Sequence, residues 1–156
     1  MKVFEEKQSF RQWWLLLVAV AALGIPMAFI IDDLLIGNLE NISIELLIAL
    51  ITLLPFIFLW KLSLHTKIDQ SGITTWWEPF HFLEKKFLWK DLKEVYVRKY
   101  NPLTEYGGWG IRGLGKTRAY NVSGKQGIQL VNPKGNFLIG TQKPTEAEAI
   151  IKKYTV

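Results

Sequence analysis

Two long apolar segments occupy most of the first sixty residues of the chain. They cover residues 13–31 and 42–60, and Glu45 is the one ionisable side chain in either segment. An α-helix rises 1.5 Å per residue, so each segment would span about 28 Å, which is close to the hydrocarbon thickness of a bilayer. The pattern therefore predicts a transmembrane helical hairpin over residues 13–60, with a short outer loop at residues 32–41.

Two features of these segments have a second interpretation. Lys2, Lys7 and Arg11 precede the first segment as in a signal peptide, although the segment is longer than a typical signal core and no small-residue cleavage site follows it. Glu45 is either a functional carboxylate inside the membrane or, because it lies three residues into its segment, a side chain that reaches the headgroups. We expect a retained first helix and an interfacial Glu45.

Basic residues are distributed unevenly around the apolar segments. Three lie in residues 1–12, none lies in residues 32–41, and sixteen follow residue 60. Because cytoplasmic flanks carry the excess of lysine and arginine, we expect a multi-pass protein of the inner, cytoplasmic membrane with both termini in the cytoplasm. Residues 1–12 are then a cytoplasmic N-terminus, and residues 61–156 are a cytoplasmic domain.

The cytoplasmic domain shows the short alternating patterns of β-strands. Turn signals at residues 70–72 (QSG) and 132–135 (NPKG) separate segments that are rich in β-branched and aromatic residues. The segment 81–89 breaks at residues 84–86 as a hairpin would, and residues 91–94 fit one helical turn. We expect about seven short strands from these signals.

One helix is predicted at the end of the chain. Thr145 and Glu148 have the spacing of a capping box, in which the two side chains and the backbone at the start of a helix bind each other. Ala147, Ile150 and Ile151 follow with the spacing of one helix face. The sequence therefore predicts a C-terminal helix that packs its apolar face against the strands.

Six short segments carry a resemblance to a known family. They are KIDQSGI (67–73), FLWKDLKEVYV (87–97), YGGWGIRG (106–113), AYNVSG (119–124), GIQL (127–130) and LIGTQKP (138–144). With them the chain resembles, over essentially its whole length, an uncharacterised family of small prokaryotic membrane proteins that have two helices and a bacterial pleckstrin-homology-like (PH-like) domain. The resemblance implies an α+β fold: a transmembrane helical hairpin followed by a small PH-like β-barrel or sandwich capped by the C-terminal helix. It implies no particular reaction or ligand.

The segment GIRGLGKT, residues 110–117, matches the P-loop pattern G-x-x-x-x-G-K-[ST]. A P-loop follows a hydrophobic strand and begins a helix, so that backbone amides, the lysine and the hydroxyl surround phosphates. Here the segment follows NPLTEYGGW and precedes RAYNVSG, which reaches a turn after six residues. We therefore interpret the match as a glycine-rich loop and expect no nucleotide.

The charge of the cytoplasmic domain indicates a contact surface. Residues 61–156 carry sixteen Lys and Arg against eight Asp and Glu, a balance of +8, which would attract anionic lipid headgroups. Glycines allow close backbone approach, and a tryptophan among cations suits a headgroup interface, although core packing is the alternative for Trp109. Adjacent Trp76 and Trp77 must point to opposite faces of a strand, so one of them is free for contact. The candidate lipid or partner contacts are Trp77, Trp109, Arg112, Lys116 and Arg118.

Other kinds of chemistry have little support in the sequence. The chain has no cysteine, and its two histidines, His65 and His81, are sixteen positions apart, so we expect no metal site, no cofactor and no catalytic residues. No nucleic-acid-binding motif accompanies the positive charge. We expect a non-catalytic, membrane-anchored PH-like binding or scaffold module. An accessory subunit of a larger integral membrane complex, with protein partners packed on the helical hairpin, is the alternative, and an enzyme comes third.

Overall fold

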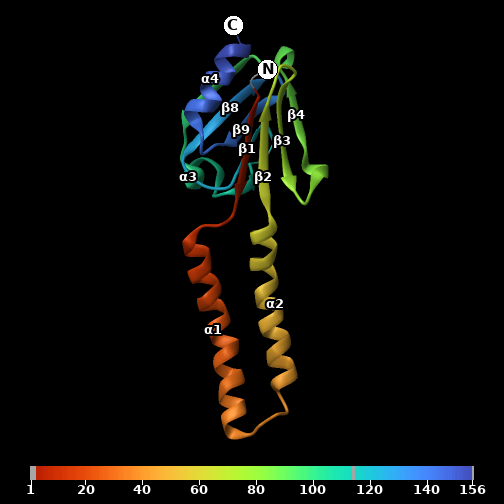
Figure 1. Ribbon diagram of the computed structural model, residues 1–156, viewed down its shortest axis with the longest axis vertical. Helices are drawn as coiled ribbons and strands as arrows, with labels where there is room; N and C mark the ends of the chain where they lie inside the picture. Colours follow the sequence, from red (N-terminus) through yellow and green to blue (C-terminus); the bar gives the residue numbers. More distant parts are fainter. Residues whose placement is uncertain (1–2, 114, 156) are drawn as a thin grey trace. The chain divides into compact units, whose positions relative to one another are not determined.

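The computed structural model describes residues 3–113 and 115–155, which form two compact units (Figure 1). Phe10–Lys61 make a helical unit, and the rest of the chain makes a second unit, called the sheet unit below. The helical unit contains α1 (Trp13–Ile36) and α2 (Ile42–Lys61). The sheet unit contains β1 (Phe4–Ser9), β2 (Ser63–Ile68), β3 (Gly72–Glu78), β4 (Lys85–Leu88), β5 (Glu94–Lys99), α3 (Pro102–Tyr106), β6 (Gly110–Arg112), β7 (Thr117–Asn121), β8 (Gln126–Asn132), β9 (Gly135–Gly140) and α4 (Pro144–Tyr154).

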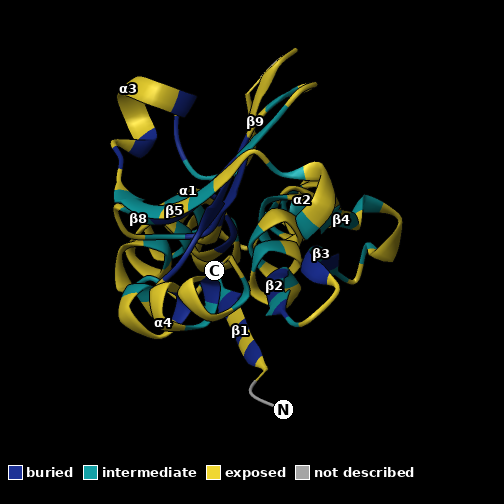
Figure 2. Cartoon of the chain, turned by 90° about the horizontal axis from the view of Figure 1, so that it is seen from above, coloured by how far each residue is buried: buried dark blue, intermediate teal, exposed yellow. Residues whose placement is uncertain are grey.

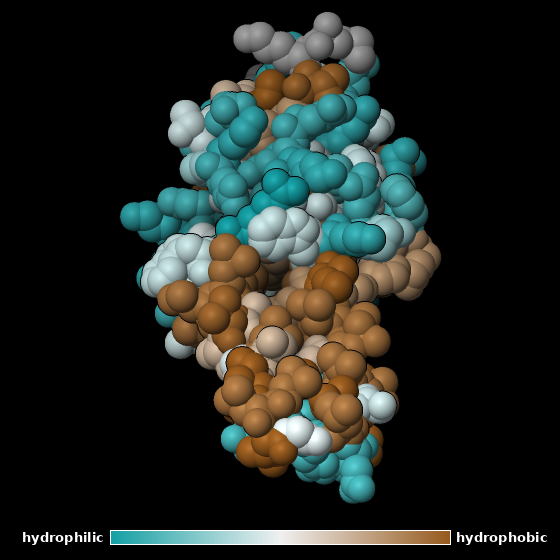
Figure 3. All heavy atoms as spheres, turned by 60° about the horizontal axis from the view of Figure 1, so that its bottom comes forward, coloured by the Kyte–Doolittle hydropathy of each residue, from teal (hydrophilic) through white to brown (hydrophobic). Residues whose placement is uncertain are grey.

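The helical unit presents apolar side chains outward along both helices. Only Pro26 and Ile30 are buried in α1, and no residue is buried in α2. Large side chains such as Val20 and Leu35 are 69% and 80% exposed, and Figure 3 shows the apolar cover of this unit. Soluble proteins rarely expose apolar surface of this extent. Both helices are long and apolar enough to cross a membrane, judged by length and composition.

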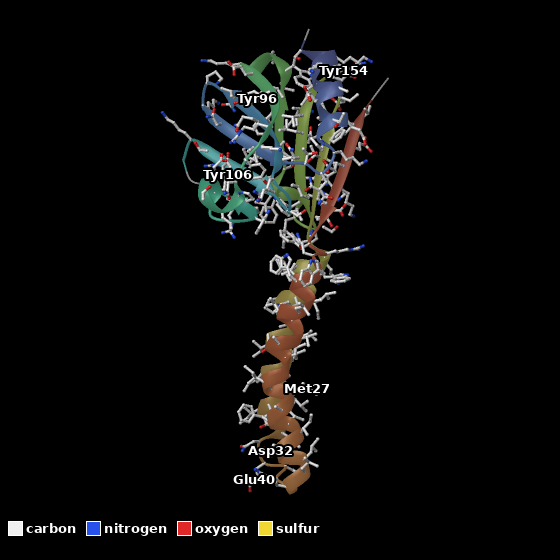
Figure 4. The ribbon with its side chains drawn as sticks, turned by 90° about the vertical axis from the view of Figure 1, so that its left-hand side faces the viewer. Met27, Asp32, Glu40, Tyr96, Tyr106 and Tyr154 are labelled. Atoms are coloured by element: carbon white, nitrogen blue, oxygen red, sulfur yellow. The ribbon has the colours of Figure 1, made fainter. Side chains whose placement is uncertain are left out.

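The first helix is longer than the sequence pattern predicts. α1 has 24 residues, so Asp32 and Asp33 lie in its last turns, and the loop predicted at residues 32–41 begins only at Gly37. Gly37 ends the helix because it takes a left-handed conformation, with φ of 73°, which residues with a side chain rarely adopt. Figure 4 places Asp32 and Glu40 together at the loop end of the unit. A glycine, rather than the first carboxylate, sets the end of the helix.

The first sheet has the strand order β1-β2-β3-β4, and all its pairs are antiparallel. β1 was not predicted from the sequence, because its buried side carries Phe4, Glu6 and Gln8, of which two are polar. β1 pairs with β2 along its whole length and ends at the pair Ser9↔Ser63. The helical unit is therefore inserted in the connection between two neighbouring strands.

The buried polar side chains of β1 have partners at the end of β9. Thr141 donates its hydroxyl hydrogen to Glu6 Oε2 at 2.6 Å, and the Gln142 backbone N–H donates to Glu6 Oε1 at 2.7 Å. Gln8 Nε2 donates to the carbonyl oxygen of Gly140 at 2.6 Å. These bonds join the N-terminal strand to the second sheet. The predicted domain of residues 61–156 lacks them, so its boundary is corrected to include β1.

The second sheet has the order β5-β8-β9-β7-β6. Its pairs are antiparallel except for β7 and β9, which run parallel. β8 and β9 form a hairpin, and β7 joins the free side of β9, so the chain crosses over between β7 and β8. The expected α+β class is confirmed, whereas the described strands form two sheets and no closed barrel.

The core of the sheet unit lies between the two sheets. Trp77 of β3 makes an edge contact with Tyr120 of β7, with ring centroids 5.9 Å apart, and Phe87 of β4 lies 5.0 Å from Phe137 of β9. α4 contacts strands of both sheets and buries Ala147. Figure 2 shows buried residues along the strands of this unit. The fully buried leucine and isoleucine side chains are Leu64, Ile68, Ile73, Ile128, Leu130, Leu138 and Ile139.

The predicted start of the C-terminal helix is wrong in detail. α4 begins at Pro144, and its N-cap residue Lys143 makes no side-chain capping bond. Proline suits the first helical position because its missing N–H would have no partner there. Thr145 is consequently already inside the first turn and cannot cap the helix. Ala147 and Ile151 of the predicted apolar face are buried as expected.

Two further local predictions are corrected. The hairpin break expected at residues 84–86 is wrong, since Lys85 and Lys86 lie in β4 and pair with β3, and the turn lies at the 3₁₀ helix His81–Leu83. The helical turn expected at residues 91–94 occurs earlier, at Trp89–Asp91. At residues 84–86 the pairing of β4 with β3 determined the structure, and the local preference of these residues for a turn did not.

Replacing Glu6 with alanine tests the buried connection of β1. We expect Glu6→Ala to lower the free energy of unfolding of the sheet unit by about 2 kcal/mol, because Thr141 and Gln142 lose a charged acceptor. Glu5 is the matched control, since its side chain is 68% exposed and pairs with Lys67 at 3.5 Å. Glu5→Ala should cost less than about 1 kcal/mol. Urea unfolding of the full chain in detergent, followed by near-UV circular dichroism, measures both; equal effects would contradict the assignment.

Candidate functional site

The tryptophan pair on β3 is divided between core and surface. Trp77 is fully buried, so its predicted role as a contact residue is wrong. The inward face of β3 carries Ile73, Thr75 and Trp77, which leaves Trp76 on the other face. Trp76 is half-buried and stacks on His65 with ring centroids 5.0 Å apart. Because successive side chains of a strand point to opposite faces, only one of the two adjacent tryptophans lies in the core.

Trp109 and Arg112 interact within their own loop. Trp109 is half-buried rather than part of the core, and its indole nitrogen lies 3.4 Å from the carbonyl oxygen of Gly124. The Arg112 guanidinium turns back and donates from Nε to the carbonyl oxygen of Trp109 at 2.7 Å. Arg112 is not among the described residues that line the groove of the two remaining candidates, Lys116 and Arg118.

Lys116 and Arg118 line a groove between the two sheets. Its volume is about 290 Å³, and it is called the cationic groove below. Four of the described lining residues are cationic and none is acidic. The lining residues are Lys85, Phe87, Gly115, Lys116, Arg118, Asn132, Lys134, Gly135, Asn136 and Phe137. Sequence analysis missed Lys85 and Lys134, because they come from segments that only the sheet pairing brings to Lys116.

A close backbone contact brings the Lys116 loop to the β8–β9 turn. The backbone N–H of Asn136 donates to the carbonyl oxygen of Lys116 at 2.6 Å, next to the parallel pair Thr117↔Asn136. Gly135 has φ of 144°, and a Cβ at this position would collide with the carbonyl oxygen of Lys116. Glycine is required here both for the conformation and for the close approach. The contact sets Lys116 and Lys134 on one side of the groove.

An aromatic contact forms the base of the groove. Phe87 of β4 and Phe137 of β9 contact each other across the sheets, and Phe137 is 6% exposed. Phe137 also makes an edge contact with Tyr120, with centroids 5.0 Å apart. Lys85 precedes Phe87 by two residues, so both side chains lie on one face of β4. The two sheets thus both supply cations to one groove that has a packed aromatic base.

The positive charge continues beyond the groove. A second hollow of about 550 Å³ shares Phe87, Asn132 and Lys134 with it and contains one acidic residue, Asp91. The ion pairs found among the described residues involve none of the cations in either hollow. The term cationic face is used below for Lys85, Lys86, Lys90, Lys93, Lys116, Arg118 and Lys134.

Carboxylates pair with several cations elsewhere on the sheet unit. Glu78 lies 2.8 Å from Lys7 Nζ and 2.9 Å from His65 Nε2, and these contacts hold the pKa of Glu78 below its ordinary value. Arg98 donates to Glu105 at 2.7 Å and lowers the pKa of that carboxyl in the same way. The cations of the cationic face are in none of the described ion pairs, and Asp91 is the one acidic residue that lines its two hollows, so the face keeps a positive potential that favours an anionic partner.

The segment that matches the P-loop pattern forms parts of two strands. β6 begins at Gly110, and β7 begins at Thr117, where a P-loop would begin a helix. Leu114 lies outside the described residues. The interpretation of the whole segment as a glycine-rich loop is therefore corrected, because Gly110–Arg112 and Thr117 lie in strands. Lys116 takes part in the cationic groove. No group of three or more His, Asp or Glu side chains in the described part of the chain is arranged to hold a metal ion.

Comparison with known proteins found no matching protein-family model and no matching curated protein. The functional argument therefore depends on the residues of the chain and on their arrangement.

Replacing Gly135 with alanine tests how the groove is built. We expect Gly135→Ala to destabilise the sheet unit by about 2 kcal/mol or more, because the new methyl group would collide with the Lys116 carbonyl oxygen. Gly124→Ala is the control, since Gly124 also has a positive φ, of 78°, but nothing lies within 4 Å of a Cβ there. It should cost about 1 kcal/mol. Urea unfolding compares the two variants, and a larger effect at Gly124 would refute the close contact.

Proposed function

We propose that this protein is a non-catalytic binding module that is anchored in the cytoplasmic membrane and holds anionic partners through its cationic face. In this proposal α1 and α2 span the bilayer, the loop between them lies outside, and both termini lie in the cytoplasm. The sheet unit is the part that binds. The observation that carries the proposal is the cationic face, where seven cations surround two hollows and Asp91 is the one acidic lining residue.

The distribution of charge supports the proposed orientation. The loop after α1 contains Asn38, Glu40 and Asn41 but no basic residue, and Asp32 and Asp33 lie just before it. At the opposite end of the helical unit, the Arg11 guanidinium lies 5.7 Å from the centroid of the Trp60 ring. Basic and aromatic residues are typical of the cytoplasmic interface, whereas lysine and arginine are depleted from outer loops.

The architecture of the sheet unit supports a PH-like classification. Two mainly antiparallel sheets face each other, and α4 follows the last strand and contacts strands of both sheets. Such folds present loops and strand edges to partners on a rigid scaffold. The cationic face combines such loops and turns with parts of β4 and β7, where Lys85, Lys86 and Arg118 lie.

An accessory subunit of a larger membrane complex is the second candidate. Its support is an open region on α1, where nothing lies within 4 Å of a Cβ at Gly24 and where Ala21 is exposed. Small residues on a membrane helix allow another helix to approach closely. Extraction in mild detergent separates the candidates, because an obligate subunit would retain partners in fixed stoichiometry.

Binding to acidic vesicles tests the proposed function. The full-length protein is placed in nanodiscs of neutral lipid, and its capture by vesicles that contain phosphatidylserine is measured at increasing salt. We expect capture at low salt and release at high salt, since exposed charges are screened over about 8 Å at physiological ionic strength. Lys116→Glu with Lys134→Glu should weaken capture by more than about tenfold, at roughly 1 kcal/mol for each basic residue near an anionic surface.

The control for this measurement reverses an equal charge on another element. Lys152 and Lys153 lie on α4, and Lys152 pairs with Glu148 at 2.8 Å. Lys152→Glu with Lys153→Glu should have a clearly smaller effect than the pair on the cationic face. Absent capture, capture that salt does not change, or equal effects of the two variants would contradict the proposal.

A further inference from the structure

We propose that the cationic groove is a site for a phosphate monoester group. This inference rests on the proposed function, that the sheet unit binds anionic partners, and adds the chemical class of the ligand. The wider cationic face attracts anions without distinguishing one kind from another, whereas the groove offers one defined position for a single anionic group. A monoester carries a charge of about −2 near neutral pH and presents three terminal oxygens as acceptors.

The polar side chains that line the groove are suited to accept such a group. Lysine and arginine act only as donors, and the groove has Lys85, Lys116, Arg118 and Lys134. Asn132 adds an amide whose oxygen already accepts the backbone N–H of Lys134 at 2.8 Å, so its NH₂ group is the part left for a ligand. An arginine can bind two phosphate oxygens in parallel, while lysines act as point charges around them.

The groove is built before a ligand arrives. Gly135 fixes the distance between the Lys116 loop and the β8–β9 turn, and the Phe87–Phe137 contact fixes β4 against β9. A preorganised site loses less conformational entropy on binding. The aromatic base also lowers the effective dielectric constant under the cations, which strengthens their attraction for a dianion.

The size of the groove favours one small group over an extended polyanion. Its volume of about 290 Å³ is at the lower limit of ordinary ligand pockets. This space suits a phosphate with a short attached group such as glycerol, and not a nucleic-acid strand. The groove lies beside the half of β3 that pairs with Lys85–Leu88. Phosphate monoesters occur both in soluble compounds and in lipid headgroups, and the test separates these two sources.

The soluble source is tested with glycerol 3-phosphate as the probe. The full-length protein is kept in a maltoside detergent, which contains no phosphorus, and the ³¹P signal of the probe is followed during titration. We expect saturable binding that Lys116→Gln with Arg118→Gln weakens by about tenfold or more, because two charge-assisted contacts are removed. Lys99→Gln with Lys125→Gln is the matched control, since both lysines are exposed, neither is in a described ion pair, and they lie at the other end of β8. It should change the dissociation constant less than about twofold.

The lipid source is tested with vesicles. The protein in neutral nanodiscs is offered vesicles with phosphatidic acid, which is a monoester, or with phosphatidylserine at equal total charge. A preference for phosphatidic acid that glycerol 3-phosphate cannot displace identifies a headgroup as ligand. Displacement by glycerol 3-phosphate identifies a soluble phosphate compound. Both results support the monoester site, provided that thermal unfolding shows the groove variant to be as stable as the wild type.

Two outcomes overturn the inference and differ in what they leave standing. If phosphatidylserine vesicles are captured in a salt-dependent way, but glycerol 3-phosphate shows no saturable binding and phosphatidic acid is not preferred, the groove assignment fails and the proposed function stands. The same conclusion follows if the Lys116/Arg118 and Lys99/Lys125 variants weaken binding equally. If no acidic vesicle is captured at any salt concentration and glycerol 3-phosphate does not bind, the proposed function and the monoester site fail together.

Discussion

Six residue pairs join β1 to β2, and the two apolar helices lie in the connection between these strands. At the last pair the Ser9 and Ser63 hydroxyls are 3.0 Å apart. The chain leaves the sheet unit after Ser9 and enters it again at Leu62. Glu6 and Gln8 also bind residues at the end of β9. This short N-terminal strand therefore connects the first sheet to the second, and the helical unit follows it in the chain.

Charge placement follows from the same architecture. Some cations elsewhere are paired with carboxylates, as Lys7 is with Glu78. The cationic face is assembled from four chain segments between residues 85 and 134, and a single lining carboxylate accompanies it. Assembling like charges in a folded unit costs free energy unless a partner or counterions neutralise them. This cost is the physical reason for the proposal that the face binds an anionic partner.

The features that the sequence predicted correctly are helices and strands that depend on residues close together in the chain. The two apolar helices, the terminal helix and most strands follow from periodicity and turn residues within short windows. β1 was missed because Glu6 and Gln8 make its buried side polar, and only Thr141 and Gly140, far along the chain, explain their burial. Two of the candidate contacts, Lys116 and Arg118, do lie together. Their neighbours Lys85 and Lys134 were missed because the parallel β7–β9 pair and the Phe87–Phe137 contact leave no local signal.

Disulfide formation between cysteines at positions 9 and 63 tests the β1–β2 pairing most directly. The chain has no cysteine, so Ser9→Cys with Ser63→Cys introduces the only two thiols. Their hydroxyl oxygens lie 3.0 Å apart, so the account predicts rapid and nearly complete cross-linking under mild oxidation of the folded full-length protein. Ser9→Cys with Ser71→Cys, which places the second thiol at the far end of β2, should remain reduced. Equal cross-linking of the two variants, or none at positions 9 and 63, would contradict the account.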